Sequence, residues 1–292
     1  MSDLYSISEL GSIPLLSVIP VHRHGNLSLA KFILETKHKN QSFIINKMTD
    51  VHVHIGQFNE KYYDAHAIFE AIEHTASQYG IDCIQYSSTS SCRYDVELSR
   101  IEEEIATAQS YKSSIIKTKP YLWFTTRYAE QRISVKSAVQ AFDYCGIKLH
   151  PIAHDWNFDN HAHRKSLDEI FCWSAESGKP ILIHSGIGDK QSPFRFEHFI
   201  KSYSAAKIIL AHSQPVNDTI NMLLKYSNVT CDIAFLSRRE IKQLLFAARK
   251  NHILQSRILF GTDFPITHYR NNKNIELTTQ YEKDCRRIYG LI

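Results

Sequence analysis

From residue 48 onward, the sequence alternates between short apolar runs that suit β-strands and longer runs with the apolar spacing of helices. Eight strands are predicted, at residues 48–55, 81–86, 120–125, 146–150, 180–184, 207–212, 229–233 and 257–261. The helices that follow them are predicted at residues 63–79, 95–111, 134–144, 166–177, 194–204, 216–226, 238–251 and 275–289. Because strands that alternate with helices pair in parallel through right-handed crossovers, eight such units predict a single-domain α/β fold, a (β/α)8 TIM barrel.

An open, doubly wound sheet is the alternative arrangement for such a pattern. That fold more often carries a glycine-rich phosphate loop after its first strand. The sequence His54-Ile55-Gly56-Gln57 is not such a loop, so the closed barrel is favoured. We expect residues 48–292 to form the barrel and residues 1–47 to form a short N-terminal extension.

Composition narrows the class of protein further. Hydrophobic residues make up 43% of the chain and charged residues 22%, which is typical of a soluble protein with a large core. A net charge of +4 gives no reason to expect a nucleic-acid partner, and no apolar run approaches the length of a membrane span. The six cysteines are scattered, as in a cytoplasmic protein with reduced thiols. The expected partner is a small-molecule substrate, and homo-oligomer formation stays open.

The first predicted strand carries two histidines on one face. Side chains alternate along a strand, so Asp50, His52 and His54 point one way and the intervening apolar residues point the other. Gly56 is expected to end the strand. Two imidazoles in this spacing can bind one metal ion. Two further His-x-His pairs, His22 with His24 and His161 with His163, are predicted to lie in a turn and in a loop or helix start.

Four later strands also end in side chains that suit a metal site. The fourth ends in Lys148 and His150, the fifth in His184, the sixth in His212 and the eighth in Asp263. Each residue taken singly has a structural explanation, such as a core histidine, a helix cap or an ion pair. Active sites of these barrels lie at the C-terminal ends of the strands, and imidazole and carboxylate are preferred zinc ligands. The joint pattern therefore predicts a metal centre.

These strand ends resemble the amidohydrolase superfamily, and more closely its amidohydrolase-related branch, which includes lactonases and non-oxidative decarboxylases. The resemblance rests on the order His-x-His, Lys, His, His, Asp at the ends of strands one, four, five, six and eight. The matching pieces are residues 50–56, 146–151, 181–186, 208–213 and 258–265. They cover nearly the whole predicted barrel and none of residues 1–47.

The resemblance implies roles for individual residues. His52, His54, His184 and Asp263 would bind one divalent metal ion, for which we expect Zn²⁺, and His212 would be a catalytic histidine beside it. Lys148 would then bind substrate or orient Asp263. In an alternative with two ions, a carboxylated Lys148 bridges the metals, and His184 and His212 bind the second one. We favour the single ion.

The expected chemistry is hydrolysis. A metal ion with an open position lowers the pKa of bound water from 15.7 to about 7, and Asp263 can accept the proton and pass it to the leaving group. His212 or the metal would polarise the scissile carbonyl. Amides, lactones and esters suit this chemistry. With a bound aromatic or unsaturated acid, the same ion could instead drive decarboxylation.

Loop residues give a prediction about the substrate. Arg93, Arg127 and Arg195 follow strands two, three and five, and Arg270 follows strand eight, so an anionic substrate is expected. Trp156, in the loop after strand four, is a weaker candidate for the pocket lining.

Two other functions are less favoured by the sequence. Metal-dependent nucleases and phosphoesterases of related design usually carry a glutamate at the end of strand four, where this chain has Lys148. A non-catalytic binding barrel is disfavoured because all expected ligands are present.

Overall fold

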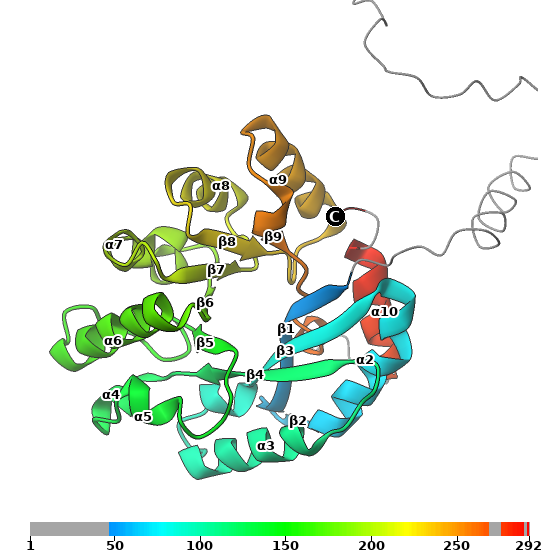
Figure 1. Cartoon of the computed structure of the whole chain (residues 1–292), viewed down its shortest axis with the longest axis horizontal. Coiled ribbons are helices and arrows are strands. Elements are labelled where there is room, and N and C mark those ends of the chain that lie inside the picture. Colours follow the sequence, from blue (N-terminus) through cyan, green and yellow to red (C-terminus); the bar gives the residue numbers. More distant parts are fainter. Residues whose placement is uncertain (1–46, 269–275, 289–290, 292) are drawn as a thin grey trace, which may run out of the picture. The chain divides into compact units, whose positions relative to one another are not determined.

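The computed structural model describes residues 47–268, 276–288 and 291, and in them the predicted (β/α)8 barrel is confirmed (Figure 1). Eight strands pair in parallel, in the order in which they occur in the chain. They are β1 (Met48–Phe58), β3 (Ile81–Ser88), β4 (Lys117–Trp123), β5 (Gly146–Leu149), β6 (Pro180–His184), β7 (Lys207–Ala211), β8 (Val229–Asp232) and β9 (Ile258–Leu259). All eight lie where the alternation predicts them.

The barrel closes where the chain after β9 meets β1. Val53 forms a parallel bridge with Phe264. The N–H of Val51 donates to the carbonyl of Phe260 at 3.0 Å, and the N–H of His54 donates to the carbonyl of Phe264 at 2.8 Å. These hydrogen bonds pair the first parallel strand with the last segment of the sheet. The open, doubly wound alternative is thereby excluded.

The first strand is longer than predicted. Gly56 does not end it, because β1 continues to Phe58 and turns back into the antiparallel strand β2 (Lys61–Tyr63). Gly56 has a φ of +83°, and a Cβ placed there would lie 2.6 Å from Ser88 Oγ and 2.7 Å from a carboxylate oxygen of Glu104. The glycine is therefore required by close packing inside the strand rather than by a turn at its end.

Helices cover the outside of the barrel, as Figure 1 shows. They are α2 (Ala65–Tyr79), α3 (Leu98–Ser110), α4 (Thr126–Glu130), α5 (Val135–Ala138), α6 (His161–Ser177), α7 (Glu197–Ser202), α8 (Val216–Lys225), α9 (Arg238–Lys250) and α10 (Leu277–Ile288). The predicted helix at 134–144 is only one turn long. Helix α6 starts earlier than predicted because the side chain of Asn160 accepts from the N–H groups of Ala162 and His163.

Two apolar cores stabilise this arrangement. The larger lies between the strands and the helices and includes Ile68, Phe171 and Leu244, all fully buried. A smaller cluster of Tyr121, Leu182, Ile209 and Ala211 comes from strands β4, β6 and β7. These four side chains alternate along their strands with members of the larger core, so they fill the barrel interior. The barrel is therefore packed below the strand ends.

The predicted N-terminal extension falls outside the described residues except for Lys47, so its boundary at residue 47 stays a prediction. None of the described helices is both long enough and apolar enough to cross a membrane.

Candidate metal centre

Strand β1 directs His52 and His54 into the barrel mouth. Both are buried, and each ring is held at its Nδ1 atom. His52 Nδ1 lies 2.9 Å from Asp232 Oδ2, and His54 Nδ1 lies 3.2 Å from Ser87 Oγ. Both Nε2 atoms are left to face the same point at the strand ends.

Asp263 meets these Nε2 atoms from across the barrel seam. Its Oδ1 lies 3.0 Å from His54 Nε2 and 3.3 Å from His52 Nε2. Asp263 has a φ of +62°, which is rare for a residue other than glycine, and its N–H donates to the carbonyl of His52 at 2.8 Å. The barrel closure itself therefore holds the carboxylate in place.

The protonation states of this cluster suit a cation. Burial lowers the pKa of His52 and of His54, so both rings are neutral near pH 7. Burial alone would raise the pKa of Asp263, but the hydrogen bond to His54 and the surrounding imidazoles outweigh burial and hold this pKa well below its usual range. Neutral imidazole and ionised carboxylate are the forms that bind divalent metal ions. The three side chains therefore fit such an ion.

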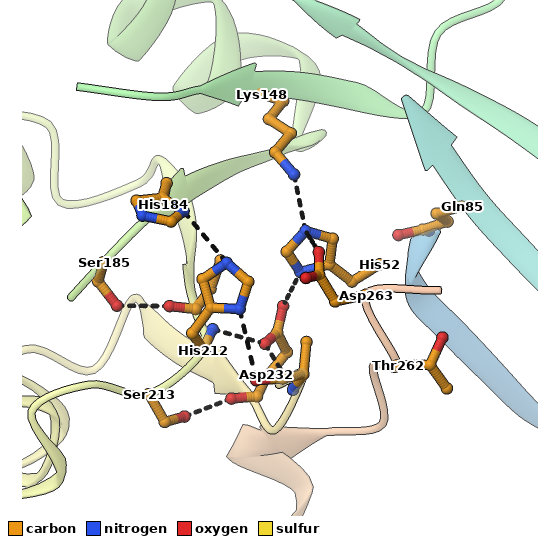
Figure 2. Close-up of polar contacts among 12 residues, drawn as sticks. His52, Gln85, Lys148, His184, Ser185, His212, Ser213, Asp232, Thr262 and Asp263 are labelled. Carbon is orange, nitrogen blue, oxygen red and sulfur yellow. Dashed lines mark hydrogen bonds and ion pairs between the residues drawn. The ribbon is translucent and has the colours of Figure 1, made fainter. Parts of the chain in front are cut away.

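Lys148 reaches the same point from β5. Its Nζ lies 2.6 Å from His52 Nε2 and 3.2 Å from His54 Nε2, as Figure 2 shows for His52. The amine also lies 4.7 Å from the centre of the Trp123 ring. Burial lowers the pKa of Lys148 to about 8. Lys148 therefore lies beside the candidate ligands, and whether it is carboxylated stays a prediction.

His184 and His212 form a second pair of rings in the barrel mouth. His212 Nε2 lies 3.1 Å from His184 Nδ1, and the ring of His212 lies 4.9 Å from that of His52. His150 stacks on His184 with ring centres 3.8 Å apart. His184 belongs to neither of the three-residue groups of converging ligand atoms found among the described residues. Its assignment as the fourth ligand stays a prediction.

Asp232, at the end of β8, is a site residue that the sequence reasoning missed. Its carboxylate is fully buried and accepts from the N–H of His212 at 2.7 Å as well as facing His52 Nδ1. The one signal in the sequence was its place near the end of the seventh predicted strand, residues 229–233, which corresponds to β8. A single aspartate after Val-Thr-Cys looks like any strand end, so the sequence did not single it out.

A cavity of about 510 Å³ opens above these residues. Its described lining includes His54, Lys148, His184, His212 and Asp263, together with Phe58, Cys92, Trp123, His150, Gln191, Gln214, Phe235 and Ile266. Among these described residues, Lys148 is the one lysine or arginine. The cavity is thus aromatic on its walls and carries its cationic group close to the candidate ligands.

The residues predicted to bind substrate lie outside this lining. Arg93 forms an ion pair with Asp95, with N···O of 2.5 Å, and Arg127 donates to a main-chain carbonyl before α3. Arg195 donates to the carbonyl of Trp156 at 2.7 Å, and Trp156 itself is buried in the core. These four residues connect and pack loops in the structure. Arg270 lies outside the described residues.

The rival His-x-His pair that the structure describes, His161 with His163, does not form a comparable site. His163 is absent from the described cavity lining, and its Nδ1 accepts from the N–H of Asn157 at 3.2 Å. His161 lies exposed at the first turn of α6. His22 and His24 lie outside the described residues.

Comparisons with known proteins concern the family and the fold of the chain. A family model described as "Amidohydrolase" matches residues 129–284, which is more than half of the chain. No curated protein sequence matches the chain.

Solved structures are similar at low identity. The phosphotriesterase homology protein of Escherichia coli, solved with phosphate in its active site, superposes with a TM-score of 0.54 at 12% identity, over 84% of this chain and 92% of its own. Dihydropyrimidinase from Brevibacillus agri has a TM-score of 0.49 at 15% identity, over 74% of this chain and 57% of its own. A TatD family hydrolase from Entamoeba histolytica has a TM-score of 0.49 at 13% identity, over 74% of each chain. The first of these shows the barrel fold.

Proposed function

Because the chain belongs to the amidohydrolase family, and is on that ground a metal-dependent hydrolase, we propose that it cleaves a small amide, lactone or ester at the barrel mouth. The observation that carries the proposal is the convergence of three donor atoms beside the cavity, namely His52 Nε2, His54 Nε2 and Asp263 Oδ1. His184 is proposed as the fourth ligand, and Zn²⁺ as the ion.

When bound by these residues, such an ion would supply Lewis acidity, which would lower the pKa of water and polarise a substrate carbonyl. The protein residues do the remaining work. Asp263 is ionised and accepts the proton of the attacking water, which it then delivers to the leaving group. Lys148 provides positive charge near the substrate carbonyl oxygen, where negative charge develops.

His212 is proposed to act beside Asp263 as a second proton acceptor. Its Nδ1 lies 3.4 Å from the carbonyl of Ala234, which can only accept a hydrogen bond. The proton of the neutral ring is therefore placed on Nδ1. Nε2 then carries a lone pair, which faces His184 Nδ1 at 3.1 Å. An acceptor at this position suits His212 to proton acceptance better than to the carbonyl polarisation expected from sequence.

The size and lining of the cavity favour a small substrate with an apolar or planar part. Phe58, Trp123 and Phe235 lie in its wall, and the described lining contains no arginine. An anionic substrate was predicted from the loop arginines, and in the structure an anion in this cavity would meet Lys148 instead. We therefore propose a substrate with at most one acidic group.

The aromatic wall of the cavity and the nearby Lys148 favour one further candidate function. An aromatic acid with its carboxylate near Lys148 could lose carbon dioxide when the ring-carboxylate bond breaks and a proton takes the vacated ring position. Release of carbon dioxide without consumption of water would identify this lyase. Hydrolysis would instead consume one water for each bond cleaved.

Metal content in a double variant tests the proposal. We expect purified protein to bind about one divalent ion and His52→Ala plus His54→Ala to lose it, measured by elemental analysis after dialysis. The matched control is His161→Ala plus His163→Ala, which removes two histidines of identical spacing away from the cavity. Full metal retention in the first variant would refute the site assignment.

A screen tests the reaction. Zinc-loaded protein is assayed against lactones, esters and amides, followed by acid production, and against aromatic acids, followed by carbon dioxide release. Cleavage that disappears in the His52 and His54 double variant and persists in the control supports the hydrolase proposal.

A further inference from the structure

Asp232 connects two parts of the candidate site that come from different strands. Its Oδ2 lies 2.9 Å from Nδ1 of His52, and its Oδ1 accepts from the N–H groups of His212 at 2.7 Å and of Ala234 at 3.0 Å. Figure 2 shows the carboxylate between the rings of His52 and His212. The side chain is fully buried, so water does not replace these contacts.

The contact with His52 determines which ring nitrogen carries the proton. A buried carboxylate whose other oxygen is occupied by two N–H donors is an acceptor at Oδ2, so it favours the proton on His52 Nδ1. His52 Nε2 then keeps its lone pair and faces Asp263 and Lys148, 3.3 and 2.6 Å away. Only this tautomer can offer Nε2 to a metal ion.

The contact with His212 holds a rare backbone conformation. His212 and Ser213 have φ values of +67° and +46°, a region that residues other than glycine seldom occupy. The carboxylate accepts the buried N–H of His212, and the Ser213 hydroxyl donates to the carbonyl of Asp232. The end of β8 therefore restrains the turn that places His212 at the cavity.

We propose that Asp232 is a positioning residue that fixes the ligand tautomer of His52 and the turn carrying His212. The proposal rests on the proposed function to the extent that His52 is a metal ligand. It assigns to the end of β8 a role that neither the sequence pattern nor the three converging ligands would require.

Asparagine is the informative substitution, because three donors face the carboxylate and asparagine has only one accepting oxygen. If that oxygen keeps the two backbone N–H groups, the NH₂ group of Asp232→Asn faces His52 Nδ1 and donates to it. The ring proton of His52 must then move to Nε2. Alanine differs in that it removes both kinds of contact.

The experiment compares Asp232→Asn and Asp232→Ala with the wild-type chain. Cobalt(II) affinity is measured by visible absorption with a competing chelator. The tautomer of His52 in metal-free protein is read from ring ¹⁵N shifts, assigned with His52→Gln, and the exchange rate of the His212 amide is followed. The control is Glu104→Gln, since this buried carboxylate accepts from the Ser88 and Ser90 hydroxyls and has no hydrogen bond to an imidazole in the part of the chain that the structure describes.

We expect Asp232→Asn to bind cobalt about 10- to 100-fold more weakly, with the proton on His52 Nε2 and a protected His212 amide. Asp232→Ala should lose cobalt affinity and His212 protection together. Glu104→Gln should keep its affinity within about threefold, since it leaves the rings untouched. If Asp232→Ala fails to fold, the isosteric Asp232→Asn variant still tests the role of Asp232.

Two results would overturn the proposal. One is an Asp232→Asn variant that binds cobalt as tightly as the wild-type chain does and keeps the proton on His52 Nδ1. The other is an equal loss of affinity in Glu104→Gln, which would mean general destabilisation. If the wild-type chain itself binds no cobalt, the proposed function fails separately, and the His52 tautomer of the metal-free protein still supports or refutes the role of Asp232.

Discussion

Oδ1 of Asp263 lies 3.0 Å from Nε2 of His54, although 209 positions separate the two residues along the chain. The contact exists because the segment after β9 pairs with β1 and closes the barrel. One backbone hydrogen bond of that closure, from the Asp263 N–H to the His52 carbonyl, ties the two sources of ligands directly. Fold closure and site assembly are therefore the same event in this protein.

Replacing the proposed base should remove activity. In Asp263→Asn we expect kcat to fall by about 100-fold or more, because asparagine cannot accept the proton of the attacking water. Steady-state kinetics on a substrate from the screen measures this at saturating zinc. Unchanged kcat would transfer the role of base to His212.

Removing the metal should destabilise the fold and also inactivate the enzyme. An ion that binds only the native state adds about 2.7 kcal/mol to the free energy of unfolding when its free concentration is about 100 times Kd. We expect chelator treatment to lower the thermal midpoint and zinc to restore it. The double variant His52→Ala plus His54→Ala should show no response to either treatment.

Acid should destabilise the protein partly through His154. Burial lowers the pKa of His154 to about 4, whereas an unfolded histidine has a pKa near 6.5. The unfolded state therefore binds the proton first, and stability is lost as pH falls from about 6.5 to about 4. This one group is expected to lower the free energy of unfolding by about 3 kcal/mol.

The measurement for His154 is urea unfolding at a series of pH values. His154→Gln keeps a donor for the carbonyl of Ser91, which His154 Nε2 contacts at 2.8 Å, and should flatten the slope between pH 6.5 and 4. Replacement of the exposed His161 by glutamine should leave the slope as it is. A wild-type slope in His154→Gln would refute the assignment.

Two glycines with positive φ should differ in their tolerance of alanine. At Gly178, with φ of +67°, the nearest atom to an added Cβ is Lys207 Nζ at 3.6 Å, so only backbone strain of about 1–2 kcal/mol is expected. At Gly56 the added Cβ would also clash with Ser88, Ser90 and Glu104. Denaturant unfolding should show a cost for Gly56→Ala at least twice that of Gly178→Ala, and equal costs would contradict the packing around β1.

The sequence predicted the barrel well because its signal is repeated. Each strand is short, apolar and followed by a helix, so an error in one boundary does not change the topology. The helix predicted at 134–144 shows the limit, since helical spacing there is compatible with a single turn, Val135–Ala138. Likewise, the sequence predicts a strand end at Gly56, because close packing between β1 and α3 is not visible in local sequence.

The candidate site could be predicted only where residue type and strand position coincide. His52, His54 and Asp263 meet both conditions, and the structure brings their ligand atoms together. Asp232 lies at a strand end, but the order of metal-binding residues predicted from the sequence does not include it. Arg93 and Arg195 lie on loops, where their partners, Asp95 and the Trp156 carbonyl, depend on conformations that no periodicity encodes.

The pairing of β1 with the segment after β9 also governs when the site can exist during synthesis. A growing chain presents His52 and His54 early, yet their carboxylate partner is made only when translation has passed residue 263. Until the ends of the barrel meet, the two histidines have no Asp263 beside them, and the edge of β1 stays unpaired on that side. A nascent or truncated chain should therefore show weak metal binding and an exposed strand edge, a state open to chaperones and to aggregation.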